Sequence, residues 1–312
     1  QGQRRVGVQP CSPLNVSCIL DRFITYKLPL SDRDDDAFST TANRGLRGSH
    51  WRGADCNDRD ASVYPGRKAR AEGVARGAVA ADDDHDCNGI SGSNASGSFE
   101  AQLCDGFERR GLIHIGDSAT AHFHLPPSWL TATGWDGVNN GFANAQDELD
   151  WPQCAWGTGY KNASECPFSA DVSMSDTLSL AGRLRQRNRC NHRDFQNVGV
   201  NGARIGAIIP MIEGVARTPE LDHPALAIVS LIGNDVCNGH ADTFKHMTTP
   251  EQFRNRTLNA LAALDRKLPN GSFVLLVGLV DGRPLYDTLH GKTHPIGTSY
   301  PDVYKYLTCN GA

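Results

Sequence analysis

Short runs of apolar residues recur along the second two-thirds of the chain. Residues 112–115, 225–232 and 272–280 are almost continuously apolar, which is typical of strands buried on both faces of a parallel sheet. Residues 249–268 begin with Thr-Pro-Glu-Gln, a helix-capping pattern, and Pro269 follows them. Strands that alternate with helices predict an α/β fold, in which a parallel sheet lies between two helical layers. The helix is expected to bury one face, formed by Phe253, Leu258, Leu261, Leu264 and Leu268.

Polar residues at the ends of these segments are candidates for chemistry. Gly116-Asp-Ser118 directly follows the first strand, and a serine at a sharp strand-to-helix turn exposes its hydroxyl. Gly-Asp-Ser also occurs in ordinary loops, so the serine alone is a weak signal. Gly202 lies in a loop where backbone can approach a ligand, and Asn234 follows the 225–232 strand. Ligands bind at the carboxyl ends of strands in such sheets, where Ser118 and Asn234 are expected to lie.

The order of this serine, glycine and asparagine resembles the first three sequence blocks of the SGNH (GDSL-type) hydrolases. The resemblance implies a three-layer α/β/α fold in which Ser118 is the nucleophile. It also implies an oxyanion hole formed by the backbone N–H groups of Ser118 and Gly202 and the side-chain amide of Asn234.

Acidic residues are concentrated in three clusters within residues 32–90. Asp84-x-Asp-x-Asn88-Gly-Ile90 matches the first half of an EF-hand loop, and Asp32-Arg-Asp-Asp-Asp36 repeats its spacing. A charge run is usually a solvated surface, but so many like charges are costly to hold together without a cation. Calcium is expected over magnesium, which prefers to keep its water ligands. The predicted ligands are Asp32, Asp34, Asp36 and the Phe38 carbonyl; Asp55, Asn57, Asp58 and Asp60; and Asp82, Asp84, Asp86, Asn88 and the Ile90 carbonyl.

The chain has ten cysteines without the spacing of a zinc site, and five Asn-x-Ser/Thr sequons. Together these features predict disulfides and a secreted or vesicle-lumen location. The formal net charge of −4 gives no reason to expect a nucleic-acid partner. No apolar run approaches the ~20 residues of a membrane-spanning helix, and a signal peptide, if one existed, is expected to have been removed. The sequons begin at Asn15, Asn94, Asn162, Asn255 and Asn270.

These patterns divide the chain into three parts. Residues 1–31 are too short for a domain and are expected to form a tail or linker. Residues 32–104 are expected to form a loop-rich, calcium-binding segment. Residues 105–312 are expected to form an SGNH-like hydrolase domain that is incomplete at its C-terminus.

Longer stretches of the sequence resemble one particular family of SGNH hydrolases. Residues 50–53, 116–124, 148–152, 187–194 and 232–237 are similar to the acyloxyacyl hydrolase family, and the similarity covers roughly residue 32 to the C-terminus. It implies a secreted lipase that removes secondary acyl chains from the lipid A of bacterial lipopolysaccharide. It also implies bound calcium and a saposin-like small subunit, which is cleaved from the same precursor and disulfide-linked. Since no six-cysteine saposin pattern is present, this chain is expected to be the large subunit.

The fourth SGNH block, Asp-x-x-His, supplies the base and its orienting carboxylate. Asp287-Thr-Leu-His290 fits these letters, but it follows the 272–280 strand closely within a Gly/Pro/Tyr-rich stretch. His294 and His122 are weaker candidates, so the base is expected on a separate C-terminal segment. Three hypotheses stay open: a lipid A-directed acyl hydrolase, an SGNH esterase acting on another acyl or carbohydrate ester, and a calcium-stabilised component without a catalytic base.

Overall fold

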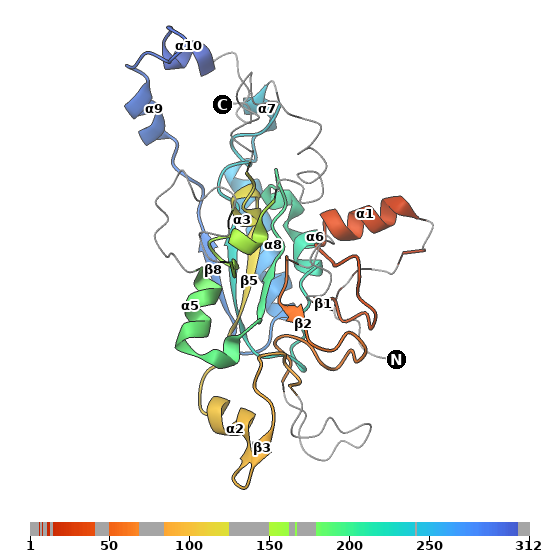
Figure 1. The fold of residues 1–312 in the computed structure, drawn as a ribbon. Helices are drawn as coiled ribbons and strands as arrows, with labels where there is room; N and C mark the ends of the chain where they lie inside the picture. The colour runs from red at the N-terminus through yellow and green to blue at the C-terminus, as the bar shows by residue number, and fades with distance from the viewer. Residues whose placement is uncertain are drawn as a thin grey trace, which may run out of the picture.

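A four-stranded parallel sheet forms the centre of the computed structural model. The strand order is β6 (Phe195–Asn197), β5 (Gly111–Gly116), β7 (Ala225–Ser230) and β8 (Phe273–Val277). Because every pairing is parallel, the carboxyl ends of the strands meet at one edge, the carboxyl edge, which lies toward α3 (Ser118–Ala121) in Figure 1. The structure describes residues 6, 8, 11–12, 15–40, 50–68, 84–124, 150–161, 166, 179–240 and 242–304.

Helices cover both faces of the sheet. Ile113 of β5 belongs to an apolar core that includes residues of α6 (Ile208–Glu213) and α8 (Pro250–Lys267). Leu112 points to the opposite face and packs with α5 (Leu180–Arg187). Successive residues of a strand point to opposite faces, so an entirely apolar strand fits this position. The predicted α/β fold with three layers is confirmed.

Helix α8 begins with the predicted capping box. The Thr249 hydroxyl accepts a hydrogen bond from the Gln252 N–H at 3.2 Å, and the Gln252 side chain accepts one from the Thr249 N–H at 3.1 Å. Phe253 and Leu264 pack on the core as predicted, but Leu258 is exposed. Five helical residues rotate a side chain by about 140° from Phe253, which explains why the prediction for Leu258 is wrong.

The remaining elements are short. The helices are α1 (Val16–Ile24), α2 (Phe99–Cys104), η3 (Pro152–Cys154), η5 (Arg189–Asn191), η6 (Ile205–Ala207), α7 (Thr243–His246), α9 (Arg283–Leu289) and α10 (Tyr300–Tyr304). The strands are β1 (Ser39–Thr40), β2 (Ala54–Asp55), β3 (Ser93–Asn94) and β4 (Gly97–Ser98). None of the helices that the structure describes is long and apolar enough to cross a membrane.

Several of the described N-terminal residues form a helix or pack against the rest of the protein. Asn15 caps α1 by accepting a hydrogen bond from the Cys18 N–H at 3.0 Å, and Phe23 of this helix is buried. Leu28 belongs to a second apolar cluster that also contains Tyr64. The sequence pattern of this stretch is too brief to indicate packing, but the cluster anchors it to the body of the protein.

β8 lies at an exposed edge of the sheet, although the sequence predicts a buried strand at 272–280. All five of its residues are exposed, and Phe273 keeps 57% of its accessible surface. No strand pairs with its outer side in the part of the chain that the structure describes. The helices that follow, α9 and α10, lie apart from the sheet (Figure 1). An apolar edge strand is a template for further pairing, so this surface is suited to being covered by another segment.

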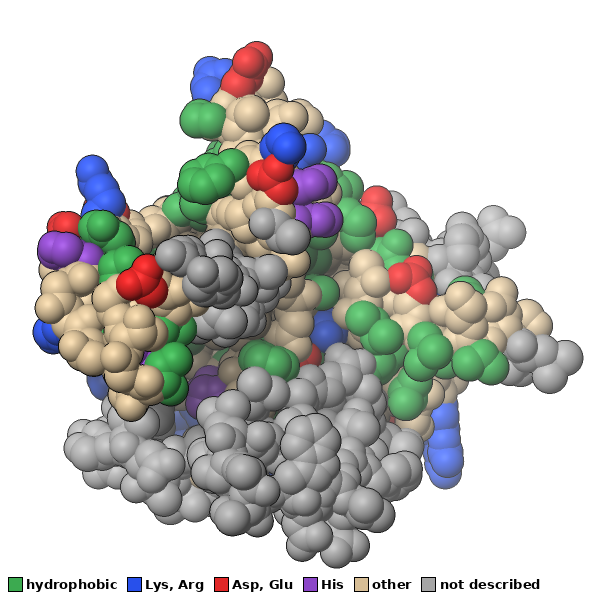
Figure 2. Space-filling model, turned by 90° about the horizontal axis from the view of Figure 1, so that it is seen from above, with side chains coloured by type: hydrophobic (Ala, Val, Ile, Leu, Met, Phe, Trp, Pro, Cys, Tyr) green, Lys and Arg blue, Asp and Glu red, His purple; other side chains and the backbone are tan. Residues whose placement is uncertain are grey.

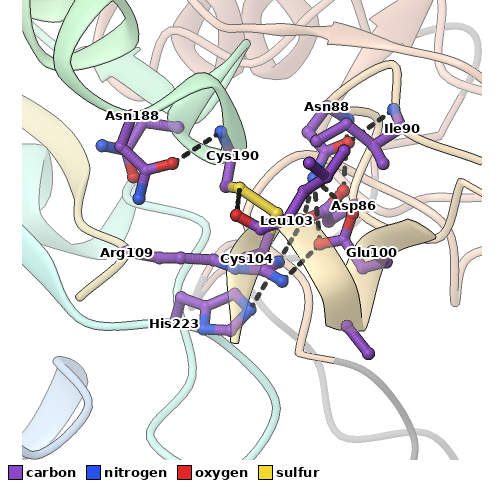
Figure 3. Close-up of a disulfide and its surroundings, with 12 residues drawn as sticks. Asp86, Asn88, Ile90, Glu100, Leu103, Cys104, Arg109, Asn188, Cys190 and His223 are labelled. Carbon is purple, nitrogen blue, oxygen red and sulfur yellow. Dashed lines mark hydrogen bonds and ion pairs between the residues drawn. A yellow bond between two sulfur atoms is a disulfide. The ribbon is translucent and has the colours of Figure 1, made fainter. Parts of the chain in front are cut away.

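Disulfides stabilise the loop-rich parts, as predicted. The described pairs are Cys11–Cys18, Cys56–Cys87, Cys104–Cys190 and Cys154–Cys166. Cys237 is also disulfide-bonded, and none of the described cysteines is free. The Cys104–Cys190 bond, shown in Figure 3, joins α2 to the segment after α5 and so ties the acidic region to the hydrolase sheet.

Denatured but unreduced protein is expected to contain essentially no thiol that reacts with a maleimide, because every described cysteine is paired. Intact mass before and after labelling measures this. Full reduction provides the control, since ten thiols should then become reactive. Several reactive thiols before reduction would contradict both the disulfides and the secretory interpretation.

Candidate active site

The turn that carries Ser118 is fixed at the carboxyl edge. Asp117 caps α3 by accepting a hydrogen bond from the Ala119 N–H at 3.1 Å. Its other carboxylate oxygen accepts one from the Ile232 N–H at 2.8 Å, which ties the turn to the segment after β7. Asp117 is buried, and this desolvation raises the pKa of its carboxyl. Ser118 itself is half-buried at the start of the helix, and the two hydrogen bonds to Asp117 hold the backbone around it in place.

A network of buried polar side chains connects this turn to the neighbouring strands. The Nε2 atom of His114 lies 3.0 Å from the Ser230 Oγ, which lies 2.8 Å from the Thr120 Oγ1. Gly116 leaves room for these groups, since a Cβ there would lie 2.0 Å from the Thr120 Oγ1. Burial lowers the pKa of His114 to about 3, so its imidazole is neutral. The network joins β5, α3 and β7.

Gly202 and Asn234 lie on neighbouring loops at the same edge. The loop after β6 is anchored by a hydrogen bond from the Val200 N–H to the Gly116 carbonyl at 3.0 Å. Gly202 has a φ of +72°, a backbone conformation that favours glycine. The Asn234 Nδ2 donates to the Ala203 carbonyl at 3.2 Å and retains a second hydrogen for a ligand. The structure therefore brings the three predicted residues to one edge of the sheet.

His122 lies close to the turn in sequence, four residues after Ser118. It ends α3 in a left-handed conformation, with a φ of +58°. Burial, followed by the neighbouring His124 imidazole, lowers the pKa of His122 to about 4. Within the described residues, no imidazole hydrogen-bonds the Ser118 hydroxyl. A histidine with so low a pKa is a weak general base.

The Asp287–His290 pair lies on α9, away from the sheet (Figure 1). The His290 Nδ1 lies 3.1 Å from the backbone carbonyls of Tyr286 and Asp287, and its ring stacks on Tyr286. His290 is exposed, and its described contacts are all local. His294 stacks edge-on against Tyr300. The structure brings none of these residues into contact with Ser118.

The first two acidic clusters come together in space. β1 pairs in parallel with β2, which brings the loop before β1 beside the residues that follow β2. Their side chains form two groups, in each of which one carboxylate oxygen per residue lies within 4.8 Å of the others. These groups are Asp32, Asp34 and Asp58, and Asp34, Asp36 and Asp55. They share Asp34, so they form one continuous acidic cluster, hereafter the double acidic cluster.

Hydrogen bonds satisfy only part of the double acidic cluster. Backbone N–H groups donate to one oxygen each of Asp34, Asp36 and Asp55, but the other oxygen of each is buried without a hydrogen-bond partner. Desolvation, reinforced by the neighbouring carboxylates, raises the pKa of Asp36 to about 8. It raises the pKa of Asp32 and of Asp55 to about 6. Converging hard oxygen atoms with excess negative charge fit calcium.

Other groups near the double acidic cluster play different parts. Asp60 belongs to neither group, and its carboxylate accepts hydrogen bonds from the N–H and hydroxyl of Ser62. The Asn57 N–H donates to Asp55 at 2.9 Å. Cys56 and Cys87 lie close to Asp55, but their disulfide excludes thiolate ligation. Ligation by the Phe38 carbonyl and by Asn57 stays a prediction.

An arginine pairs with part of the third acidic cluster, whereas one oxygen of Asp84 is buried without a hydrogen-bond partner. Asp86 and Glu100 both pair with the guanidinium of Arg109, at 2.8 Å for Asp86 (Figure 3). The Asn88 side-chain amide donates to Asp86 and to Glu100 at 3.0 Å. These carboxylates therefore have partners other than a metal ion. The Arg109 guanidinium competes with a metal ion for these carboxylates. The sequence pattern does not indicate this contact.

The EF-hand-like turn of this third cluster is nevertheless formed. Gly89 has a φ of +82°, and its N–H donates to Asp84 at 2.9 Å. The Asn88 side-chain oxygen accepts a hydrogen bond from the Ile90 N–H at 2.7 Å. Asp82 lies outside the described residues. Ligation by this cluster stays a prediction.

Comparison with known proteins decides the family. Residues 112–304 match the GDSL-like lipase/acylhydrolase family. The chain belongs to this family. It is 43% identical over 298 residues to the acyloxyacyl hydrolase of Oryctolagus cuniculus. It is 41% identical over 297 and 293 residues to the acyloxyacyl hydrolases of Mus musculus and Homo sapiens. These matches cover 90–92% of this chain and 48% of each relative, so the chain spans about half their length.

As a GDSL-like hydrolase, the chain has its sheet and candidate active site within the matched region. Ser118, Gly202 and Asn234 all lie inside residues 112–304, whereas the acidic clusters precede it. The polar residues whose hydrogen bonds connect the loops of the site were not predicted from the sequence. His114, a lone polar residue within an apolar strand, was the one available signal. Asp150 and its partner Lys27 gave none, because they lie far apart in the sequence, at positions 27 and 150.

Proposed function

We propose that this chain is the catalytic part of a secreted, calcium-binding serine esterase that removes secondary acyl chains from the lipid A of lipopolysaccharide. The observation that carries the proposal is the convergence of Ser118, Gly202 and Asn234 at the carboxyl edge. The 41–43% identity to acyloxyacyl hydrolases supports the ester class. The substrate follows from the resemblance.

In the proposed reaction, the Ser118 hydroxyl gives its proton to a base and attacks the ester carbonyl; the ester C–O bond breaks, the alcohol leaves with a proton, and an acyl-enzyme remains. Water then hydrolyses the acyl-enzyme, which releases the fatty acid and restores Ser118. Negative charge develops on the carbonyl oxygen during attack. The N–H groups of Ser118 and Gly202 and the second amide hydrogen of Asn234 stabilise that charge. Both steps need a base, because a neutral serine hydroxyl and a water molecule are both poor nucleophiles.

The base is proposed to come from a further segment of the complete protein. No described imidazole hydrogen-bonds the Ser118 hydroxyl, and His290 makes only local contacts. The exposed apolar edge at β8 offers that segment a surface on which to pair. The relatives, about twice as long as this chain, contain enough additional polypeptide to supply it.

A lipid substrate agrees with the exposed apolar side chains on the segment that follows β7. Phe244, ten residues after Asn234, keeps 86% of its accessible surface, and Val236 keeps 41%. Hydrophobic side chains are exposed in several places on the face seen in Figure 2, which is viewed from the end where α9 and α10 lie. Such side chains are suited to contact acyl chains.

Secretion, glycosylation and the small subunit are further parts of the proposal. The four described sequon asparagines are all exposed, as a glycan requires: Asn15, Asn94, Asn255 and Asn270. Every described cysteine is already disulfide-bonded. A covalent bond from one of them to a saposin-like subunit would therefore require a change of partner.

The complete protein, including any disulfide-linked subunit, tests the proposed substrate. It is expected to release fatty acid from hexa-acylated lipid A and to leave a tetra-acylated product, measured by mass spectrometry. Hydrolysis of short esters without action on lipid A would favour the second hypothesis, an esterase for another substrate. No action on either would favour the non-enzymatic component.

Replacing His290 with alanine is expected to change turnover less than twofold, because His290 is exposed and contacts only its own helix. Lys292→Ala, a neighbouring exposed position, is the matched control. The measurement is kcat/KM for ester hydrolysis by the complete protein. A loss comparable with that of Ser118→Ala would instead make Asp287 and His290 the base and its orienting carboxylate.

A further inference from the structure

A buried carboxylate lies between the two loops that carry the candidate oxyanion donors. Asp150 keeps 2% of its accessible surface and forms an isolated antiparallel bridge with Phe123, just after α3. The next N–H in the chain, that of Trp151, donates to the carbonyls of Ala121 and His122, both at 3.2 Å. The backbone of residues 150–151 is therefore attached to the helix that Ser118 begins.

The side chain of Asp150 contacts the other loop. One carboxylate oxygen accepts a hydrogen bond from the Asn201 Nδ2 at 2.7 Å. Asn201 directly precedes Gly202, whose N–H direction is set by the turn at φ +72°. A hydrogen bond to a carboxylate is short and strong compared with one between neutral groups. Asp150 thus connects the Ser118 helix to the Gly202 turn.

A buried lysine balances the charge of Asp150. The Lys27 Nζ lies 3.8 Å from the second carboxylate oxygen, and both side chains are 1% exposed. The same Nζ lies 4.1 Å from the centroid of the Trp51 ring. A buried ion pair is often no more stabilising than two apolar residues of the same size. Its fixed geometry suits a role in orienting Asn201.

We propose that Asp150 is a positioning residue of the active site. Held by Lys27, it fixes Asn201 and thereby directs the Gly202 N–H toward the oxyanion that forms at Ser118. This inference rests on the proposed function. It adds that the spacing of the oxyanion donors depends on an ion pair between the N-terminal segment and the hydrolase domain.

The Asn201→Ala variant of the complete protein tests the proposal. Asn201 is exposed, so the substitution removes the hydrogen bond without emptying a core position. We expect kcat for a soluble short-chain ester to fall about tenfold to a hundredfold, as for a small misplacement of a catalytic group. KM should stay within about twofold and the melting temperature within about 2 °C of wild type, because the lost contact acts on the transition state.

Gln102→Ala is the matched control. Gln102 is an exposed amide on α2, which lies away from α3 in Figure 1, and its side chain donates to Asn94 and to the Gly97 carbonyl. It should leave kcat unchanged. If wild-type protein hydrolyses neither this ester nor lipid A, the proposed function fails. If wild type is active and Asn201→Ala has an unchanged kcat, the positioning role alone fails.

A double substitution separates positioning from stability. Lys27→Met with Asp150→Leu removes both buried charges and keeps comparable side-chain volumes. This variant should lose as much kcat as Asn201→Ala, and adding Asn201→Ala to it should cost nothing more, because both changes break the same contact. Losses in kcat that multiply in the combined variant would overturn the proposal and leave the ion pair a purely structural role.

Discussion

Replacing Ser118 with alanine is expected to lower kcat for ester hydrolysis by the complete protein by roughly 10⁴–10⁶. The substitution removes the atom that forms the acyl-enzyme and leaves the oxyanion donors in place. The fold should be unaffected, because the side chain is half-buried and the turn is held by Asp117 instead. Steady-state kinetics and the melting temperature together measure these effects.

Ser91→Ala is the control for this variant. Ser91 is an exposed serine in the loop after the third acidic cluster, and its replacement should leave turnover at the wild-type level. Residual activity of Ser118→Ala within tenfold of wild type would show that another residue carries the reaction. The assignment of Ser118, Gly202 and Asn234 as oxyanion donors would then be wrong as well.

Removing calcium is expected to lower the melting temperature by roughly 3–10 °C. The reason is the double acidic cluster, in which Asp34, Asp36 and Asp55 each have a buried oxygen without a hydrogen-bond partner. A cation that binds only the folded state stabilises it by mass action. Differential scanning fluorimetry with excess chelator, followed by readdition of calcium or magnesium, measures the effect. An unchanged melting curve would contradict the calcium proposal.

The effect of the chelator should grow with pH. Without metal, the folded-state pKa of Asp36 is raised to about 8, and those of Asp32 and Asp55 to about 6. All lie above the ordinary value of about 3.9. The folded state then binds more protons than the unfolded state, so the stability of the chelated protein falls as pH rises from about 4 to 8. With calcium bound, ionised carboxylates are favoured and this fall should be absent.

The Asp36→Asn variant provides a matched test of this pH dependence. It keeps an acceptor for the Phe38 N–H but removes one buried charge. At pH 8, the chelated variant should melt higher than the chelated wild type and gain less from calcium. Asp105→Asn, at an exposed position, should behave as wild type. An equal gain from calcium in Asp36→Asn and wild type would contradict the assignment of Asp36 as a ligand.

The sequence predicts those features of the fold that local pattern determines. Apolar runs mark β5, β7 and β8, and the capping box marks the start of α8. The position of a strand within the sheet is not local. β8 is as apolar as a central strand, yet it lies at the edge, because burial depends on what covers it and not on its own residues.

The residues of the candidate site likewise divide into those that local sequence predicts and those that it does not. Ser118 and Asn234 could be found because each follows a strand whose carboxyl end is predictable, whereas Gly202 was found through the resemblance to the SGNH blocks, since β6 was not predicted. The proximity of the first two acidic clusters in space could not be predicted, because it depends on the short pairing between β1 and β2. The contact of Arg109 with Asp86 and that of Lys27 with Asp150 were equally hidden. Each is a pairing of single side chains that lie apart in the sequence, at positions 86 and 109 in the first case and 27 and 150 in the second.

The most direct test of the central claim is the residue that a fluorophosphonate probe modifies in the complete protein. Such a probe reacts with an activated serine and places its phosphonyl oxygen in the oxyanion hole. Peptide mapping by mass spectrometry should find one adduct, on Ser118, and the Ser118→Ala variant should give none. An adduct on a different serine, or no adduct on a complete protein that hydrolyses esters, would contradict the assignment of Ser118 as the nucleophile.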